Sequence, residues 1–468
     1  MPRPWEAFYP SSARGSYPDQ PLDAFVTASD RIALVDGEET WTYATLRVRI
    51  DEAAGWFAAR GVVPGARVLL HLPNSVAFVV AYYGALRAGG IVSAASPELG
   101  EEAFRHQRDD VDPVLVVDAA TEIGCGEPPP RAPHDIAVLQ YTSGTTGTSK
   151  GAIMTHRNLV TNALQNARWF GWSGREVNLA VLPLCHTWGM CVCLNSTFAV
   201  GGTLVLARRF DPQETLAAIA RHGATVLYGS ATMFHRLLDV AAHAVPTLRH
   251  VKAGAMLTQG DLKARWDARY PHAPMQQGYG LTEASPESHN NPPLRFRAGT
   301  VGVPLPDTDC RIVAEDGRLL GPDEVGEVCL RGPQVSRGYW GRPARADAWL
   351  PTGDLGRMDA DGYLTIVDRK KDMLKFRGYS VSPNVIEDCL LAHPAVAEAV
   401  VVGRPDERDG DLPVAYLVGD AQSDEAMDAH CRAALARYEV PRIFRWVDAI
   451  PKNHVGKPLR RALRTLEQ

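Results

Sequence analysis

Short apolar runs alternate with amphipathic ones through much of the chain. Strict alternation of apolar and polar residues predicts strands, and apolar residues three or four apart predict helices. Up to residue 95 the pattern predicts two strands around a turn at Asp36-Gly37, a helix over 44–59, a strand at 67–72, a helix at 75–88 and a strand at 91–95. Because strands alternate with helices, a mostly parallel α/β sheet is favoured.

The same alternation returns after residue 150. The predicted elements are a helix over 158–170, a strand at 178–184, a helix that begins at 188 and ends at Gly201-Gly202, a strand at 203–207, a helix over 212–223 and a strand at 225–230. Between these two regions lies a Pro-rich stretch, GEPPPRAPHD at 126–135, which predicts a rigid surface connector.

From about residue 300 the pattern changes to short β-like segments separated by turns. These segments cover 309–320, 325–332 and 361–368. After the charged run DRKKDM at 368–373, Ser382 predicts a helix N-cap with Pro383 at the first helical position. Strands at 397–403 and 413–418 and a helix near 424–437 follow. We expect a large domain over 1–368, a linker at 369–371 and a small α+β domain over 372–468.

The composition is that of an ordinary globular protein, 45% hydrophobic and 22% charged. At 468 residues the chain is too long for one compact core, so two or more domains are expected. A net charge of −5 gives no sign of bulk nucleic-acid binding. The most apolar stretch, SVAFVVAYYGAL at 75–86, is too short to span a bilayer and predicts a buried helix.

The N-terminus and the cysteines bear on the compartment. Residues 1–19 contain no apolar signal-peptide core. The eight cysteines form no C-x-x-C pair, and Cys191-x-Cys193 lies in an apolar run, where buried thiols are favoured over a metal pair. We expect a reduced, cytoplasmic chain.

One stretch carries distinctive chemistry: YTSGTTGTSKG at 141–151. Its glycines let backbone N–H groups approach oxygens closely, its hydroxyls donate hydrogen bonds, and Lys150 supplies charge. The spacing fits neither the Walker A pattern nor the Rossmann G-x-G-x-x-G. A plain Ser/Thr/Gly linker is the alternative, but the stretch lies between two apolar strands, which favours a loop that holds an anion.

Three later motifs have both a functional and a structural interpretation. PTGDLG at 351–356 places Asp354 between glycines, where it could be an ordinary turn residue. The DRKK run at 368–371 could be a solvated surface, and Lys457, after a flexible glycine, could be a solvated tail charge. QGYGLTEAS at 277–285 places a tyrosine, a threonine and a glutamate in a glycine-bounded turn.

Taken together, the motifs resemble those of the adenylate-forming superfamily, which includes acyl-CoA synthetases, peptide-synthetase adenylation domains and beetle luciferases. The resemblance covers nearly the whole chain. Its motifs, in order, are WTYATL, LRAGGIVSAASPEL, YTSGTTGTSKGAIMTH, LPLCHTWGM, QGYGLTEAS, PTGDLG, DRKKDMLKFRGYSVSPNVIE and IPKNHVGKPLRR. The implied fold is a large α/β N-terminal domain with mixed sheets, packed helices and a β-rich subdomain, plus a small, mobile α+β C-terminal domain.

The resemblance implies two half-reactions. A carboxylate attacks the α-phosphate of ATP to give an acyl-adenylate and pyrophosphate, and a thiol or another acceptor then takes the acyl group. The opening loop would wrap the β- and γ-phosphates through Thr142, Ser143, Gly144, Thr145, Thr146, Gly147 and Lys150. The adenine would be enclosed by Gly254, Ala255, Gln277, Gly278, Tyr279 and Gly280, with Tyr279 stacked on it.

The remaining implied ATP contacts are catalytic or bind the ribose. Thr282 would contact the α-phosphate, and Glu283 would hold Mg²⁺, a hard cation that prefers oxygen ligands. Asp354 would accept hydrogen bonds from both ribose hydroxyls, with Arg369 beside it. Lys457 would reach the carboxylate and α-phosphate oxygens, and removing one such donor typically costs ~10²–10³ in rate.

The C-terminal domain would rotate between the two half-reactions. The implied pivot is Lys371. After rotation, the loop carrying the CoA-binding residues Lys375, Gly378 and Tyr379 would face the active site, and Gly378 suits the wall of a pantetheine tunnel because it has no side chain.

The acyl pocket is implied by position only. Its expected residues are His186, also a catalytic candidate, with Trp188, Gly189, Met190, Ser230, Met233, Met256, Ala284 and Ser285. His186 and Trp188 could equally be ordinary core. LPLCHTWGMCV lacks the acidic residue typical of α-amino acid activation, and Trp188 and Met190 indicate an apolar or aromatic acid.

The leading hypothesis is an ATP- and Mg²⁺-dependent acid–CoA ligase whose partners are a small carboxylic acid and CoA. An acceptor such as a carrier-protein thiol, an amine or another nucleophile is the alternative, and a catalytically inactive nucleotide-binding protein is a second. We expect no nucleic-acid partner, no membrane segment, and a monomer or homodimer.

Overall fold

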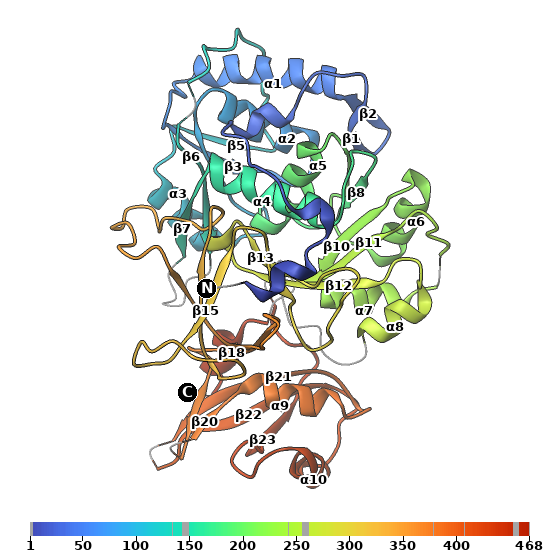
Figure 1. Cartoon of the computed structure of the whole chain (residues 1–468), viewed down its shortest axis with the longest axis vertical. Helices are drawn as coiled ribbons and strands as arrows, with labels where there is room; N and C mark the ends of the chain where they lie inside the picture. The colour runs from blue at the N-terminus through green and yellow to red at the C-terminus, as the bar shows by residue number, and fades with distance from the viewer. Residues whose placement is uncertain are drawn as a thin grey trace.

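The computed structural model describes residues 3–132, 134–142, 149–241, 243–254, 262–377, 379–406, 408–452 and 458–467 (Figure 1). Its largest sheet has nine strands in the order β14-β13-β12-β11-β10-β8-β9-β1-β2. Their bounds are β1 Ile32–Asp36, β2 Glu39–Thr42, β8 Val177–Ala180, β9 Thr203–Leu206, β10 Val226–Ser230, β11 His250–Gly254, β12 Met275–Gly280, β13 Glu287–Asn290 and β14 Val303–Pro304. The strands from β12 to β1 run parallel, which confirms the mostly parallel sheet.

A second sheet has five strands in the order β5-β3-β4-β6-β7. Their bounds are β3 Arg67–His71, β4 Ile91–Ala94, β5 Leu115–Asp118, β6 Ile136–Thr142 and β7 Lys150–Thr155. These strands are parallel except for β6 and β7, which form an antiparallel hairpin around the predicted anion loop.

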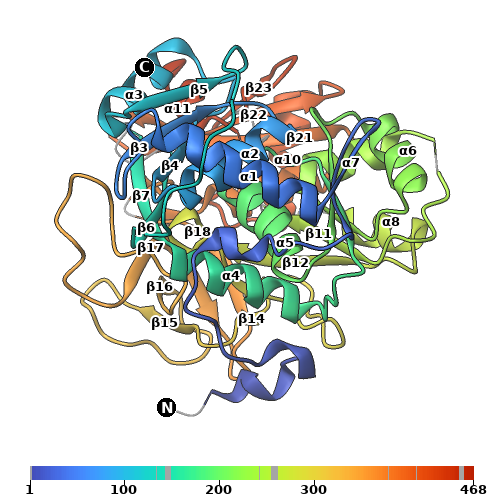
Figure 2. The same cartoon turned by 90° about the horizontal axis from the view of Figure 1, so that it is seen from above.

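Helices cover both faces of the nine-stranded sheet. On one side lie α1 Tyr43–Ala58, α2 Val76–Arg87, α4 His156–Trp169, the π-helix η4 Trp188–Asn195 and α5 Ser196–Ala199, and on the other α6 Pro212–His222, α7 Ala231–Asp239 and α8 Leu262–Arg269 (Figure 1). α3 Glu101–Val111 packs beside the second sheet, and short 3₁₀ helices cover Pro4–Phe8, Ser11–Ala13 and Leu22–Phe25. Figure 2 shows α1 and α2 side by side, and in Figure 1 they lie at the end of the molecule away from the C-terminal unit.

Two predicted elements differ from the structure. The strand expected at 178–184 ends at Ala180, because the Asn74 side chain forms hydrogen bonds with the backbone that follows. It accepts from Leu184 N at 2.7 Å and donates to Leu182 O at 2.9 Å. The helix expected from 188 begins as a π-helix and continues as the short α5. The helix predicted at 75–88 is confirmed as α2, and its residues from Phe78 to Leu86 are all buried.

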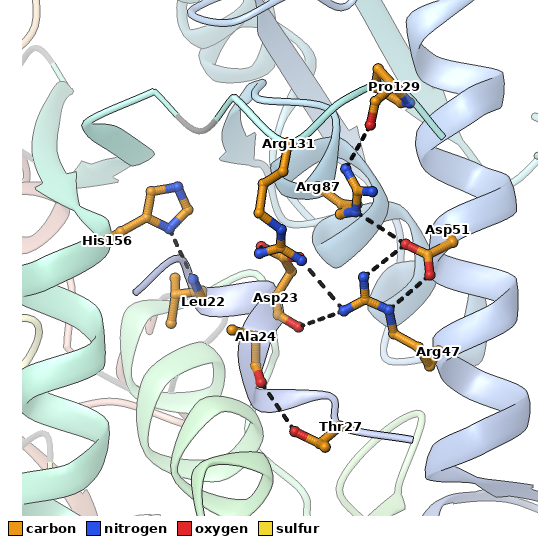
Figure 3. Close-up of polar contacts among 10 residues, drawn as sticks. All are labelled: Leu22, Asp23, Ala24, Thr27, Arg47, Asp51, Arg87, Pro129, Arg131 and His156. Atoms are coloured by element: carbon orange, nitrogen blue, oxygen red, sulfur yellow. Dashed lines mark hydrogen bonds and ion pairs between the residues drawn. The ribbon is translucent and has the colours of Figure 1, made fainter. Parts of the chain in front are cut away.

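The connector at 126–135 is pinned to the molecule at several points (Figure 3). Arg131 pairs with the buried Asp23 at 2.5 Å, and Arg47 lies 3.8 Å from the same carboxylate. Arg87 donates to the Pro129 carbonyl at 2.9 Å and pairs with Asp51, which also binds Arg47. The network therefore fixes the segment that leads into β6 and the predicted anion loop.

A β-rich unit and a small α+β unit complete the chain. The first contains β15 Asp309–Val313, β16 Gly326–Arg331, β17 Leu350–Met358 and β18 Leu364–Arg369. The second contains β19 Leu374–Phe376, β20 Tyr379–Val381, α9 Pro383–Leu391, β21 Val396–Asp406, β22 Gly410–Gly419, α10 Asp424–Ala434, β23 Ile443–Trp446 and α11 Arg460–Thr465. α9 begins as predicted, with the Ser382 hydroxyl capping Val385 N. Among the described helices, none is long and apolar enough to cross a membrane.

Candidate active site

Asp354 lies on β17, where polar side chains already contact its carboxylate. Only 6% of the residue is exposed, and its carboxylate accepts a hydrogen bond from the Tyr279 hydroxyl at 2.6 Å. Arg369 lies opposite on β18, with Nε 3.2 Å from the other carboxylate oxygen. Burial and the Asp354 charge raise the pKa of Tyr279, so its hydroxyl stays a donor. The interpretation of Asp354 as a turn residue is wrong, because PTGDLG is part of strand β17.

Glu283 lies in a second cluster, on the 3₁₀ helix η5 Thr282–Ala284 that follows β12. The Tyr339 hydroxyl donates to its carboxylate at 2.6 Å, and the Lys150 ammonium lies 5.8 Å from the centre of the Tyr339 ring. Burial and the Glu283 charge raise the pKa of Tyr339. Tyr339 thus brings Lys150 and Glu283 into one cluster, which places a cation and a carboxylate together as a site for phosphates and a metal ion would require.

Sequence reasoning missed Tyr339. The position of Tyr339 is fixed because the backbone of 338–340 pairs with the edge of strand β7. Ile153 N donates to Gly338 O at 2.9 Å, and Trp340 N donates to Gly151 O at 2.8 Å. The only available signal was the aromatic pair after Gly338, which does not reveal a partner 56 residues away.

The ends of the predicted anion loop are fixed. Thr142 and Lys150 are register partners at the top of the β6–β7 hairpin. The Ser149 hydroxyl donates to Thr142 O at 2.8 Å, and His106 on α3 contacts Ser149 O at 3.0 Å. The other predicted phosphate contacts, Ser143, Gly144, Thr145, Thr146 and Gly147, lie outside the described residues.

The predicted adenine wall is tightly packed. A Cβ at Gly254 would lie 2.7 Å from the Trp188 indole. A Cβ at Gly278 would lie 2.2 Å from the Asn290 side chain, and one at Gly280 would lie 1.9 Å from Pro286 O. These glycines are therefore needed for packing, whatever they contribute to ATP binding. Gln277 directly precedes Gly278 on β12, and Ala255 and Met256 lie outside the described residues.

The predicted acyl-pocket residues fall into two groups. Ser230 and Met233 line a cavity of about 1020 Å³, whereas the described lining of that cavity does not include His186, Trp188, Gly189, Met190, Ala284 or Ser285. Trp188 and Met190 are buried in the main core, and His186 Nδ1 accepts from Trp188 N at 3.2 Å. A Cβ at Gly189 would lie 2.2 Å from Pro183 O, and Ala284 and Ser285 are buried beyond Glu283.

The large cavity lies between the nine-stranded sheet and the C-terminal unit. Its lining from that unit includes Leu391, 396–400, Lys452 and Pro458. Lys452 and Pro458 pair across the base of the segment that carries Lys457, which itself lies outside the described residues. The cations along the cavity are Arg208, Arg209, Arg236, Arg265 and Lys452, and the acids are Glu98, Asp239 and Glu398.

The described residues predicted to form the pivot and to bind CoA do not line the large cavity. Lys371 lines a smaller cavity of about 250 Å³ with Asp411 and Arg464, and burial lowers its pKa. The Lys375 backbone N–H donates to Asp411 at 2.9 Å, and the half-exposed Tyr379 stacks on Tyr438 at 4.3 Å. β20 lies on the side of the C-terminal unit remote from the nine-stranded sheet (Figure 1). Gly378 lies outside the described residues.

The donor set fits Mg²⁺ bound together with phosphates. Among the described residues, no three His, Cys, Asp or Glu side chains gather as a metal site. A lone carboxylate such as Glu283 is nevertheless a usual protein ligand for Mg²⁺, which keeps several waters and takes its other oxygens from substrate phosphates. Among the residues that the structure describes, the Tyr339 hydrogen bond takes one Glu283 oxygen and leaves the second available for a cation.

Comparison with known proteins agrees with this geometry. A family model described as AMP-binding enzyme matches residues 23–340, and one described as AMP-binding enzyme C-terminal domain matches residues 385–457. The chain belongs to the AMP-binding enzyme family. The adenylate-forming fold expected from the sequence is therefore confirmed.

Relatives of this AMP-binding enzyme align over nearly the full chain. A long-chain-fatty-acid–CoA ligase of Bacillus subtilis (strain 168) is 31% identical, covering 98% of this chain and 97% of its own. The o-succinylbenzoate CoA synthetase of Bacillus subtilis, solved with its acyl-adenylate intermediate, is 30% identical with a TM-score of 0.86, covering 95% of this chain and 98% of its own. The same synthetase, solved with ATP and a magnesium ion, has a TM-score of 0.87 at 29% identity, covering 95% of this chain and 99% of its own.

Proposed function

We propose that this AMP-binding enzyme is an AMP-forming acid–CoA ligase that uses ATP, Mg²⁺ and CoA. The observation that carries the proposal is the pairing of two preformed clusters, Tyr279–Asp354–Arg369 and Lys150–Tyr339–Glu283. The first supplies a buried carboxylate for vicinal hydroxyls, and the second a cation and a carboxylate for a polyphosphate. The family and the ligase names of its relatives support the same reaction.

In the first half-reaction, a carboxylate oxygen of the acid attacks the α-phosphorus, the bond to the bridging oxygen breaks, and pyrophosphate leaves. Asp354 accepts the ribose hydroxyls, and Lys150 attracts the leaving phosphates. Mg²⁺, held at Glu283, supplies positive charge to the phosphate oxygens when bound. Lys457 and Thr282 would stabilise charge at the α-phosphate, where a preorganised donor acts most strongly.

In the second half-reaction, the CoA sulfur attacks the acyl carbon and AMP leaves, with the thiol proton passing to solvent or AMP. Because β20 lies on the side of the C-terminal unit remote from the nine-stranded sheet, the predicted role of Lys375 and Tyr379 requires the C-terminal unit to rotate about Lys371. The cationic cavity that includes Arg209 and Arg236 suits an anionic nucleotide such as CoA. An apolar or aromatic acid, predicted from Trp188 and Met190, remains the proposed substrate class.

The decisive experiment follows ATP–pyrophosphate exchange with a panel of carboxylic acids, and then thioester formation with CoA by mass spectrometry. We expect exchange with at least one acid and a CoA thioester of that acid. Exchange without thioester would assign another acceptor, such as a carrier-protein thiol. No exchange with any acid would overturn the proposal. Lys457→Ala should slow exchange ~10²–10³-fold, and equal loss when acyl-adenylate is supplied would contradict the two-step arrangement.

A further inference from the structure

The loop that follows Tyr339 is closed by Arg345. In the backbone, Arg345 N donates to Arg337 O at 3.1 Å. The Arg345 guanidinium donates from Nη2 to Ser336 O at 2.7 Å and from Nε to Asp347 O at 2.9 Å. Two backbone carbonyls therefore fix the orientation of a guanidinium at the end of the segment that carries Tyr339.

This segment is attached by its backbone to both charged residues of the Lys150–Tyr339–Glu283 cluster. Ser336 N donates to the Glu283 carbonyl at 2.8 Å. Trp340 N donates at 2.8 Å to the carbonyl of Gly151, the residue after Lys150. The loop that Arg345 closes is therefore joined to Glu283 and to the strand that carries Lys150.

The charge of Arg345 is not matched by an acid. Among the residues that the structure describes, its guanidinium forms no ion pair, and the nearby Asp347 carboxylate lies 3.8 Å from Arg311 instead. Burial lowers the pKa of Arg345, whereas the charges of Asp347 and Tyr339 act in the opposite direction. A partly buried cation that carbonyls orient and no carboxylate neutralises is stabilised when an anion binds beside it.

We propose that Arg345 is a further ATP-binding residue, which pairs with the β- and γ-phosphates and holds the pyrophosphate until it leaves. The inference rests on the proposed assignment of Lys150 and Glu283 to the phosphates, and it goes beyond the ligase proposal because it is the same for any acyl acceptor. Nη1 of Arg345 has no hydrogen-bond partner among the described residues, so both of its N–H groups can donate to phosphate oxygens. Arg345 lies outside every motif that carries the family resemblance.

The test measures the binding of ATP and of AMP, each with Mg²⁺, by calorimetric titration of the whole chain. Arg345→Gln removes the charge and keeps a side chain that can donate hydrogen bonds. We expect its Kd for ATP to rise roughly tenfold, the value of one charge-assisted hydrogen bond. Its Kd for AMP should stay unchanged, because AMP lacks the β- and γ-phosphates. Arg345→Lys keeps the charge without the planar donors and should recover part of the ATP affinity.

Arg337→Gln is the matched control, because Arg337 belongs to the same segment but pairs with Asp135 at 2.8 Å on the surface. It should leave both affinities unchanged. Equal weakening of ATP and AMP binding in Arg345→Gln would mean that Arg345 only supports the loop, and unchanged ATP binding would mean that it does not contact the phosphates. Either result overturns the inference. If Arg345→Gln does not fold, Arg345→Lys gives the same comparison, since its loss must be confined to ATP.

The binding test also separates this inference from the ligase proposal. No pyrophosphate exchange with any acid would overturn the ligase proposal, whereas the comparison of ATP with AMP needs no acid and no acceptor. A loss of ATP affinity confined to the Arg345 variants would therefore support the phosphate contact in either case.

Discussion

At the scale of single residues, Tyr339 shows how a side chain far away in sequence positions the carboxylate that we propose to bind Mg²⁺. Its hydroxyl donates to one oxygen of Glu283, and the Lys150 ammonium lies 5.8 Å from the centre of its ring. Without that hydrogen bond, the Glu283 side chain would sample other rotamers, and the other oxygen would no longer be aimed at the phosphates. Tyr339 is thus a positioning residue.

Tyr339→Phe should therefore raise the Mg²⁺ concentration needed for half-maximal pyrophosphate exchange and lower kcat/KM for ATP about tenfold, because one hydrogen bond to a charged group contributes roughly 1.5–3 kcal/mol. The measurement is exchange as a function of Mg²⁺. Tyr363→Phe is the control, since the Tyr363 hydroxyl donates to the Arg295 carbonyl at 2.7 Å rather than to a residue of the site. An unchanged Mg²⁺ dependence would argue against the positioning role.

Buried imidazoles give a second effect at this scale. His156 accepts a hydrogen bond from Leu22 N at 3.1 Å (Figure 3), and burial lowers its pKa to about 4. His289 is fully buried, and its pKa falls to about 3. Both side chains are neutral in the folded state at pH values where a free imidazole already takes up a proton.

Stability should consequently fall as the pH drops below the ordinary histidine value near 6.5 toward about 4, because the unfolded chain binds more protons in that window. For His156 the loss at pH 5 relative to pH 7 is about 2 kcal/mol. Urea unfolding at the two pH values should show a smaller pH-dependent loss in His156→Gln than in the wild type. An identical loss in both proteins would mean that His156 protonates freely in the folded state.

At the scale of elements, the connector at 126–135 depends on a buried carboxylate. Asp23 is 1% exposed, and Arg131 reaches it from the connector itself. Arg131→Ala leaves that carboxylate with Arg47 at 3.8 Å, so the free energy of unfolding should fall by about 2–3 kcal/mol, toward the cost of breaking a buried pair. Arg337→Ala removes an exposed pair with Asp135 at the end of the same connector and should cost below about 1 kcal/mol. If urea unfolding showed comparable losses of unfolding free energy in Arg131→Ala and Arg337→Ala, the buried pair with Asp23 would not be what stabilises the connector.

The elements show what periodicity can and cannot predict. α1, α2, α4, α6 and α9 lie close to their predicted ranges, because an apolar stripe and a capping residue are local signals. The contact of Tyr279 with Asp354 is not local: it depends on how β12 and β17 pack, and the motifs alone place these strands only through the family resemblance. The register of β17 against β18, which sets Asp354 opposite Arg369, and the Tyr339–Glu283 bond likewise have no sequence signature.

At the scale of the whole molecule, Asp368 connects the β-rich unit to the C-terminal unit. Its carboxylate accepts from the Ser382 hydroxyl at 2.5 Å and from Asn384 N at 3.2 Å, both at the start of α9. A negative charge at a helix N-terminus is stabilising. Rotation of the C-terminal unit about Lys371 would have to break these contacts, so they hold the arrangement seen here.

Ser382→Ala should thus slow pyrophosphate exchange by roughly tenfold, the value of one charge-assisted hydrogen bond, and change thioester formation from supplied acyl-adenylate much less. Ser423→Ala is a matched control, because the Ser423 hydroxyl caps α10 in the same way, accepting from Ala426 N at 3.3 Å within the C-terminal unit. If Ser382→Ala slowed both half-reactions equally, the contact between Asp368 and Ser382 would not favour the arrangement for adenylate formation over the one for thioester formation.

The contact between Gly254 and the Trp188 indole has a consequence for how this enzyme can change. Gly254, in the predicted adenine wall, and Trp188, on the helix predicted to face the acid, are in van der Waals contact. There is no space for even a methyl group between them. Substitutions at the two positions are therefore coupled: a larger residue at 254 is tolerated only with a smaller one at 188. Evolution or engineering that widens the acid side through Trp188 should free 254 to vary as well, so ATP affinity and acid choice will drift together rather than separately.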